Sequence, residues 1–82
     1  MSQRVVLLLQ QGGDGPPCKV REISQVEVIC LQDDSQFIIE HYACDQQFVV
    51  SGVGMHEITI PPGIVRVRRS VGNSPATVYA WS

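Results

Sequence analysis

Apolar and polar positions alternate with a period of two through much of the 82-residue chain. The longest stretch spans residues 56–69, where two alternating runs flank a Pro-Pro-Gly corner. Because successive residues of a strand point to opposite faces of a sheet, one face of this stretch is apolar, comprising Ile58, Ile60, Val65 and Val67. The pattern predicts a β-hairpin in which Ile60 faces Val65 and Glu57 faces Arg68.

Other strand-length segments are separated by Gly, Pro, Asp, Asn and Ser. No window shows the apolar recurrence of an amphipathic helix. Two of the segments, 25–32 and 36–44, are expected to form a second hairpin in which Val26 and Val28 point inward. The sequence predicts an all-β fold in one domain, residues 1–82: a small antiparallel β-sandwich, jelly roll or barrel of about seven to eight short strands. The remaining predicted strands are 3–10, 18–22, 47–51 and 76–81.

The first predicted strand contains an unbroken apolar run from Val5 to Leu9. Such a run is typical of a strand covered on both faces, and in so small a domain a neighbouring subunit is expected to cover one of them. The run is too short to span a bilayer. It is also shorter than the apolar region of a signal peptide, so we expect the segment to stay in the mature protein and no membrane to be involved.

Composition limits the possible functions further. With 44% hydrophobic and 17% charged residues, the chain has the composition of a soluble globular protein. Its formal charge of −2 disfavours general electrostatic binding to nucleic acid. We therefore interpret Arg66, Arg68 and Arg69 as a solvated strand face and expect no direct contact with nucleic acid.

Candidate catalytic and metal-binding residues are few. The odd cysteine count, Cys18, Cys30 and Cys44, indicates reduced thiols in a protein made in a cytosol. His41 and Cys44 stand three residues apart, which does not match a closed zinc site. Neither they nor His56 come with the orienting group and oxyanion donors that a Cys-His nucleophile needs. We predict no metal, no cofactor and no enzyme activity.

Aromatic residues suggest binding instead of chemistry. Tyr79 and Trp81 lie two residues apart in the last predicted strand and so share one of its faces with Thr77. Exposed aromatic rings on a sheet form a platform for sugars, but they are equally common at protein interfaces. Both interpretations stay open at this point.

The run from Ile58 to Val67, followed by a turn and a short strand at 77–80, resembles the closing half of small β-rich accessory proteins of tailed bacteriophage particles. Those proteins often end in such an apolar-Pro-Pro-Gly-x-x-Arg hairpin, and the resemblance covers roughly residues 52–82. It implies a non-enzymatic virion component, a capsid decoration or cement protein. Proteins of this kind sit on the head lattice, often as trimers, and clamp neighbouring copies of a major capsid protein.

The expected contact residues lie on the terminal strands. They are Leu7, Leu8 and Leu9 of the first strand and Tyr79 and Trp81 of the last. We expect a homo-oligomer, with a trimer favoured, located in the virion. The alternatives are a tail, collar or fibre-associated β-module of a phage, and a small carbohydrate-binding module.

Overall fold

The computed structural model describes residues 4–9, 14–30, 35–72 and 74–81, and these form eight strands and no helix. The all-β prediction is therefore confirmed. The strands are β1 (Arg4–Leu9), β2 (Cys18–Val20), β3 (Ile23–Cys30), β4 (Gln36–His41), β5 (Gln46–Ser51), β6 (Gly54–Ile60), β7 (Gly63–Val71) and β8 (Ala76–Trp81).

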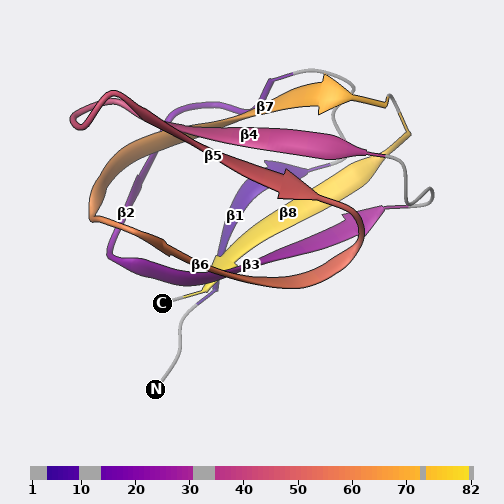
Figure 1. Ribbon diagram of the computed structural model, residues 1–82, viewed down its shortest axis with the longest axis horizontal. Coiled ribbons are helices and arrows are strands. Elements are labelled where there is room, and N and C mark those ends of the chain that lie inside the picture. Colours follow the sequence, from indigo (N-terminus) through magenta and orange to yellow (C-terminus); the bar gives the residue numbers. More distant parts are fainter. Residues whose placement is uncertain (1–3, 10–13, 31–34, 73, 82) are drawn as a thin grey trace.

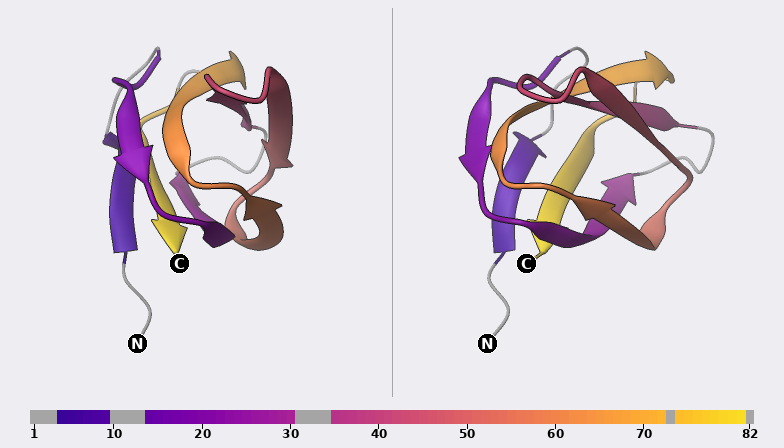
Figure 2. Two further views of the ribbon diagram at one scale, coloured as in Figure 1. Left: turned by 90° about the vertical axis from the view of Figure 1, so that its left-hand side faces the viewer. Right: turned by 60° about the vertical axis from the view of Figure 1, so that its left-hand side comes forward.

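The strands form two antiparallel sheets that pack face to face (Figures 1 and 2). Sheet A has the order β1-β8-β3-β6, and sheet B has the order β2-β7-β4-β5. This is the order of a jelly roll, one of the three architectures that the sequence allowed. Strand β1 lies at one edge of sheet A and β2 at the corresponding edge of sheet B, with β6 and β5 at the opposite edges.

The topology follows from a chain that doubles back on itself and then rolls up. β1 pairs with β8, β2 with β7, β3 with β6 and β4 with β5, all antiparallel. The tip of this doubled chain is the four-residue turn Tyr42–Asp45 between β4 and β5, where Asp45 has a positive φ of 50°. The opposite end of the doubled chain is the pair β1 and β8, so the two terminal strands lie side by side (Figure 1).

The core lies between the sheets and is built from the inward positions of the alternating pattern. In β8, buried and half-buried residues alternate without exception, as they do in β4. Val26 and Val28 of β3 point inward as predicted, with exposed fractions of 0% and 1%. The fully buried large side chains are Phe37, Leu7, Ile23, Ile39, Ile60, Val26, Val28, Val50, Val65, Val67 and Val78.

Both predicted hairpins are wrong in their pairing. β6 belongs to sheet A and β7 to sheet B, and the same holds for β3 and β4. Glu57 therefore faces Gln25 of β3, while Arg68 faces Ile38 of β4. In a jelly roll each strand pairs with the strand that lies equally far from the tip on the other arm of the doubled chain. Of the consecutive strands discussed here, β4 and β5 are adjacent to the tip and therefore pair, whereas β3 and β4, like β6 and β7, lie in different sheets. Ile60 and Val65 still share one core, because they meet it from opposite sheets.

The crossing from β6 to β7 is fixed by a buried histidine. The ring of His41 lies at the end of β4 and is 4% exposed. Its Nε2 donates to the carbonyl oxygens of Pro61 and Pro62, at 3.1 and 3.2 Å. Its Nδ1 accepts from the backbone N–H groups of Ala43 and Cys44, at 3.2 and 3.3 Å. The neutral tautomer protonated at Nε2 thus ties the proline corner to the β4–β5 turn.

Gly63 follows the two prolines with φ 148°, a conformation that favours glycine. A β-carbon at this position would come within 2.9 Å of Cε1 and Nε2 of His41. The glycine of the Pro-Pro-Gly corner is thus required by the close approach of the histidine ring.

Candidate functional site

The outer face of sheet A carries a row of side chains from all four strands. The register places Val6 beside Tyr79, Tyr79 beside Glu27, and Glu27 beside Met55. Val6 and Met55 are 45% and 48% exposed, and Ile29 on the same face is 51% exposed. The outer face of sheet A therefore combines exposed aliphatic side chains with a central aromatic residue.

Tyr79 and Trp81 are held in place by charged neighbours. The guanidinium of Arg4 lies 4.3 Å from the ring centre of Tyr79 and 5.8 Å from that of Trp81. The indole Nε1 of Trp81 donates to Oε1 of Glu27 at 3.3 Å. Cation–π contact and a charge-assisted hydrogen bond both restrict side-chain rotation, so the half-buried rings form a preorganised surface.

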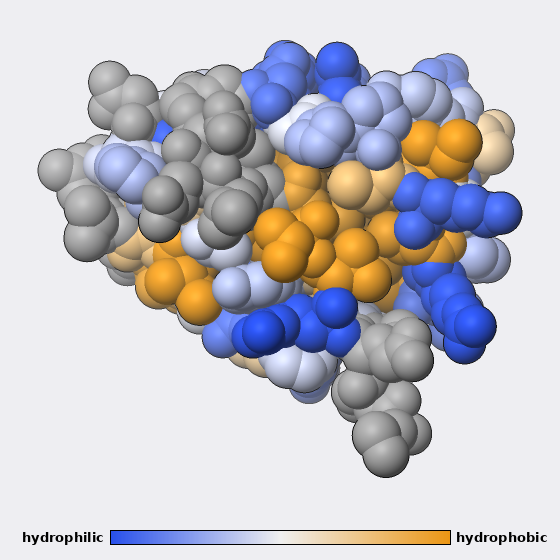
Figure 3. Space-filling view, turned by 180° about the vertical axis from the view of Figure 1, so that it is seen from behind, coloured by the Kyte–Doolittle hydropathy of each residue, from blue (hydrophilic) through white to orange (hydrophobic). Residues whose placement is uncertain are grey.

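A hollow opens where β1 and β2, the edge strands of the two sheets, separate. Its volume is about 200 Å³, and its lining consists of Val5, Lys19, Val20, Arg21, Ile23, Ala80 and Trp81. Figure 2 places β1 and β2 on the side seen in Figure 3, where apolar side chains gather in the middle and strongly hydrophilic ones surround them. We call this hollow the β1–β2 cavity.

The contact residues predicted from the sequence are partly brought together. Tyr79 and Trp81 share the outer face of sheet A, as expected. Leu7 needs a correction, because it lies at a bulge in β1 and its side chain is buried in the protein's own core at 2% exposure. Leu8 and Leu9 continue the pairing of β1 with β8, but their side chains lie outside the described residues.

The outer face of β1 is incompletely covered, because Val6 is 45% exposed. The predicted cover by a neighbouring subunit stays a prediction.

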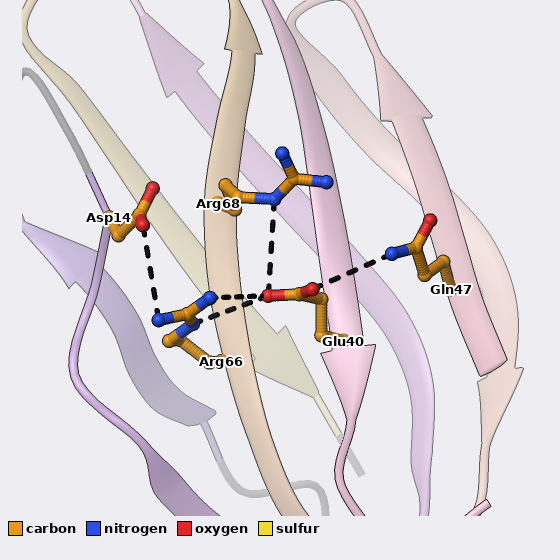
Figure 4. Close-up of polar contacts among 5 residues, drawn as sticks. All are labelled: Asp14, Glu40, Gln47, Arg66 and Arg68. Atoms are coloured by element: carbon orange, nitrogen blue, oxygen red, sulfur yellow. Dashed lines mark hydrogen bonds and ion pairs between the residues drawn. The ribbon is translucent and has the colours of Figure 1, made fainter. Parts of the chain in front are cut away.

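A polar network occupies the outer face of sheet B (Figure 4). Oε1 of Glu40 accepts hydrogen bonds from Nε and Nη2 of Arg66, at 3.3 and 2.7 Å. Arg66 also lies 3.9 Å from Asp14, and Arg68 lies 3.9 Å from Glu40. Gln47 donates to the second oxygen of Glu40 at 3.5 Å. The arginines of β7 are therefore paired mainly with β4, and not with Glu57 as the predicted hairpin required.

This network shifts the titration of its members. The hydrogen bond from Arg66 lowers the pKa of Glu40 below its ordinary 4.5, with further lowering from the charges of Arg66 and Arg68. The same bond raises the pKa of Arg66. Glu40 is therefore an ionised hydrogen-bond acceptor at neutral pH and not a proton donor.

A second hollow lies beside the β4–β5 turn and has a volume of about 280 Å³. Its lining is mostly polar and consists of Glu40, His41, Tyr42, Asp45, Gln46, Gln47 and Arg66. Tyr42 is 56% exposed. The sequence pattern gave no hint of this hollow, because its residues come together through the turn and the pairing of β4 with β7.

Other candidate groups have structural roles. No group of three or more His, Cys, Asp or Glu side chains suited to a metal lies within the described residues. Both ring nitrogens of His41 are engaged by the backbone, and no disulfide joins the three cysteines. The guanidinium of Arg69 lies 4.9 Å from the ring centre of Phe37, and its buried nitrogens have no hydrogen-bond partner in the described part of the chain.

Comparison with known proteins gives no relative from which the role of this site could be inferred. No family model, no curated protein and no solved structure matches the chain. Among the described residues there is no helix long and apolar enough to cross a membrane.

Sequence reasoning missed the cations of the β1–β2 cavity. Lys19 and Arg21 lie in and directly after a three-residue strand, and their spacing of two resembles any solvated strand face. Eight residues separate β1 from β2 in the chain, and only the meeting of the two strands makes Lys19 and Arg21 neighbours of Val5. The sequence feature that could have pointed to the cavity was the apolar run of the first strand, because such a strand needs cover on both faces.

Proposed function

We propose that this protein is a non-enzymatic structural protein of a virus particle, a decoration protein that binds a major capsid protein and stabilises the head lattice. The observation that carries the proposal is the outer face of sheet A, where exposed Val6, Ile29 and Met55 share the face with the fixed rings of Tyr79 and Trp81. Protein interfaces are enriched in aromatic residues, Met and Arg, and rigid rings act as anchors in them.

The jelly-roll order of the strands supports the proposal at the level of architecture. Jelly rolls occur in viral capsid proteins and in lectins. A fold hosts many functions, so this support is an analogy, and the exposed surface of sheet A carries the proposal.

The proposed mechanism is the addition of many weak contacts. On a repeating lattice each decoration protein binds several neighbouring sites, and the second contact forms at high effective concentration once the first is made. The proposal includes a homotrimer in which each copy contacts the next in a closed ring. Sedimentation equilibrium tests this part, with a mass three times that of the chain expected and a stable monomer contradicting it.

The decisive test of location is mass spectrometry of purified particles with a copy number. A decoration protein is expected on the order of hundreds of copies per particle, because its sites repeat with the lattice symmetry. A copy number of about a dozen or fewer would instead indicate a tail, collar or fibre-associated module. Absence of the chain from the particles would refute both forms of the proposal.

The binding surface is tested by a pair of charge insertions. Val6→Glu places a carboxylate on the outer face of sheet A and is expected to weaken co-sedimentation with capsid shells at least about tenfold. Val49→Glu is the matched control, because Val49 lies on β5 in the other sheet and is 55% exposed. Equal binding by the two variants would contradict the assignment of this face.

A carbohydrate-binding module is the second candidate, and the hollow beside the β4–β5 turn favours it. Exposed Tyr42 next to the fixed carboxylate of Glu40 matches the pairing of ring and polar groups that sugars need. The Tyr79 ring suits a sugar less well, because the Arg4 guanidinium lies over it. A glycan array tests this candidate: binding lost in Tyr42→Ala but kept in Tyr79→Ala supports it, and no binding refutes it.

A further inference from the structure

We propose that the β1–β2 cavity binds an extended acidic segment of a partner protein, which adds as a strand to the free edge of β1. This inference rests on the proposed function where it takes the partner to be the capsid protein. Such strand addition gains affinity from main-chain hydrogen bonds and specificity from pockets that take alternate side chains.

The backbone of β1 offers the first part of the site. β1 ends the strand order of sheet A, so one of its edges pairs with no described strand. The carbonyl oxygen of Val6 accepts a long hydrogen bond from the thiol of Cys18, at 4.0 Å, and the bond from an added strand would replace it. Because the N–H and C=O of one residue in an antiparallel strand point the same way, Val6 presents both groups to an added strand.

The cavity offers the second part. Val5 pairs with Ala80, which is 2% exposed, so both side chains point toward the core. Val5 is nevertheless 38% exposed, because the sandwich is open between β1 and β2. The inward side chains of an added strand would cover Val5 and extend over Val20 and Ile23, which line the same cavity. Apolar residues at alternate positions are therefore expected in the partner segment.

Charge selects the rest of the partner segment. Lys19 and Arg21 line the cavity, and neither forms an ion pair within the described part of the chain. Glu22 is the acid that adjoins these cations in the chain. Two of the six Lys and Arg residues thus line this cavity in a protein whose net charge is −2.

The same cations argue against a second copy of the chain as the occupant. β1 of another copy, Arg4–Leu9, carries an arginine and no Asp or Glu, so as an added strand it would offer no carboxylate to Lys19 and Arg21. Like charges placed against each other across an interface disfavour that partner, whereas Asp and Glu beside the apolar anchors favour an acidic one.

The test uses the whole protein and two short acetylated peptides, one alternating valine with aspartate and the other alternating valine with lysine. Titration followed by ¹⁵N–¹H NMR is expected to shift amides of β1 and β2 with the acidic peptide and to leave them unchanged with the basic one. Lys19→Gln with Arg21→Gln is expected to weaken binding about five- to tenfold, as the loss of two exposed ion pairs predicts. Gln46→Glu with Thr59→Glu is the control, because it changes the net charge equally on the opposite edge strands β5 and β6.

N-methylation of the peptide separates strand addition from simple adsorption. In an added strand, the N–H groups of alternate residues point to β1 and those of the remaining residues point away from it. Two peptides are therefore made, one methylated at the valine nitrogens and the other at the aspartate nitrogens. Only the peptide whose β1-facing N–H groups are left free should bind. Equal binding of both, equal binding of the basic peptide, or shifts confined to β5 and β6 would overturn the inference. Shifts in β1 that depend on protein concentration without peptide would show a second copy at the edge and would also overturn it.

Particle binding then separates this inference from the proposed function. If the protein is found in purified particles but the Lys19→Gln, Arg21→Gln variant binds them normally, the inference fails and the proposed function stands. If the acidic peptide binds at β1 but particles lack the protein, the site stands and the virion role fails.

Discussion

His41 is expected to contribute more to stability than any other polar side chain in the described structure, because it joins the β4–β5 turn to the crossing between the sheets. His41→Phe keeps a planar aromatic ring at this site but leaves two backbone N–H groups and the carbonyls of Pro61 and Pro62 without their partner. At about 1 kcal/mol for each neutral hydrogen bond, and counting the two carbonyls as sharing one donor, the loss is about 2–4 kcal/mol. For a domain of this size that corresponds to a fall in Tm of about 8–30 °C.

Equilibrium unfolding in urea, with an unchanged m value, measures this loss. His56→Phe is the matched control, because the half-buried His56 ring makes one bond to the Gly52 carbonyl oxygen, at 3.0 Å. Its replacement should cost about 1 kcal/mol or less. Amide hydrogen exchange at Ala43 and Cys44 should accelerate in His41→Phe beyond the global change. A His41→Phe variant within about 0.5 kcal/mol of the wild type, or no worse than His56→Phe, would refute the reasoning.

Three further outcomes follow from local contacts. Because the pKa of Glu40 is lowered in the folded protein, the stabilisation from its pair with Arg66 is fully present above pH 4.5 and is lost as the pH falls through the lowered pKa. The Tm of the wild type should therefore exceed that of Glu40→Gln at pH 6, and the difference should shrink toward pH 3. A constant difference would contradict this. Gly63→Ala should destabilise the folded protein by about 2 kcal/mol or more, because the backbone is strained for alanine and the added β-carbon clashes with the ring of His41. Gly54→Ala is the control for strain alone, because Gly54 has φ 120° but no atom lies within 4 Å of an added β-carbon. Arg69→Met keeps the contact with Phe37 and removes an unpartnered buried guanidinium, so thermal unfolding should show an equal or higher Tm; a lower one would show that the charge is paired.

The alternating pattern was sufficient to predict the strands and their inward faces. The last strand was predicted with its observed limits, and Val26 and Val28 were assigned to the core correctly. Side-chain alternation and turn residues are local properties, so they are readable from one segment at a time. The same locality explains the shared face of Tyr79 and Trp81, which depends on nothing outside β8.

Pairing is a different matter, because an apolar face is satisfied equally by a neighbour in the same sheet and by a strand across the core. The two alternating runs around the Pro-Pro-Gly corner fit a hairpin and a crossing between sheets equally well. The rest of the chain decides which strands pair. β6 pairs with β3, β7 pairs with β2 and β4, and the ring of His41 fixes the corner between β6 and β7.

The sequence by itself determined the all-β class, the inward positions and the aromatic pair of the last strand. The tertiary structure decided which strands are neighbours, that Leu7 belongs to the core, and that Lys19 and Arg21 border an open cavity beside Val5. The physical reason is that burial, strand edges and charge clusters depend on contacts between segments far apart in the chain, which no local pattern contains.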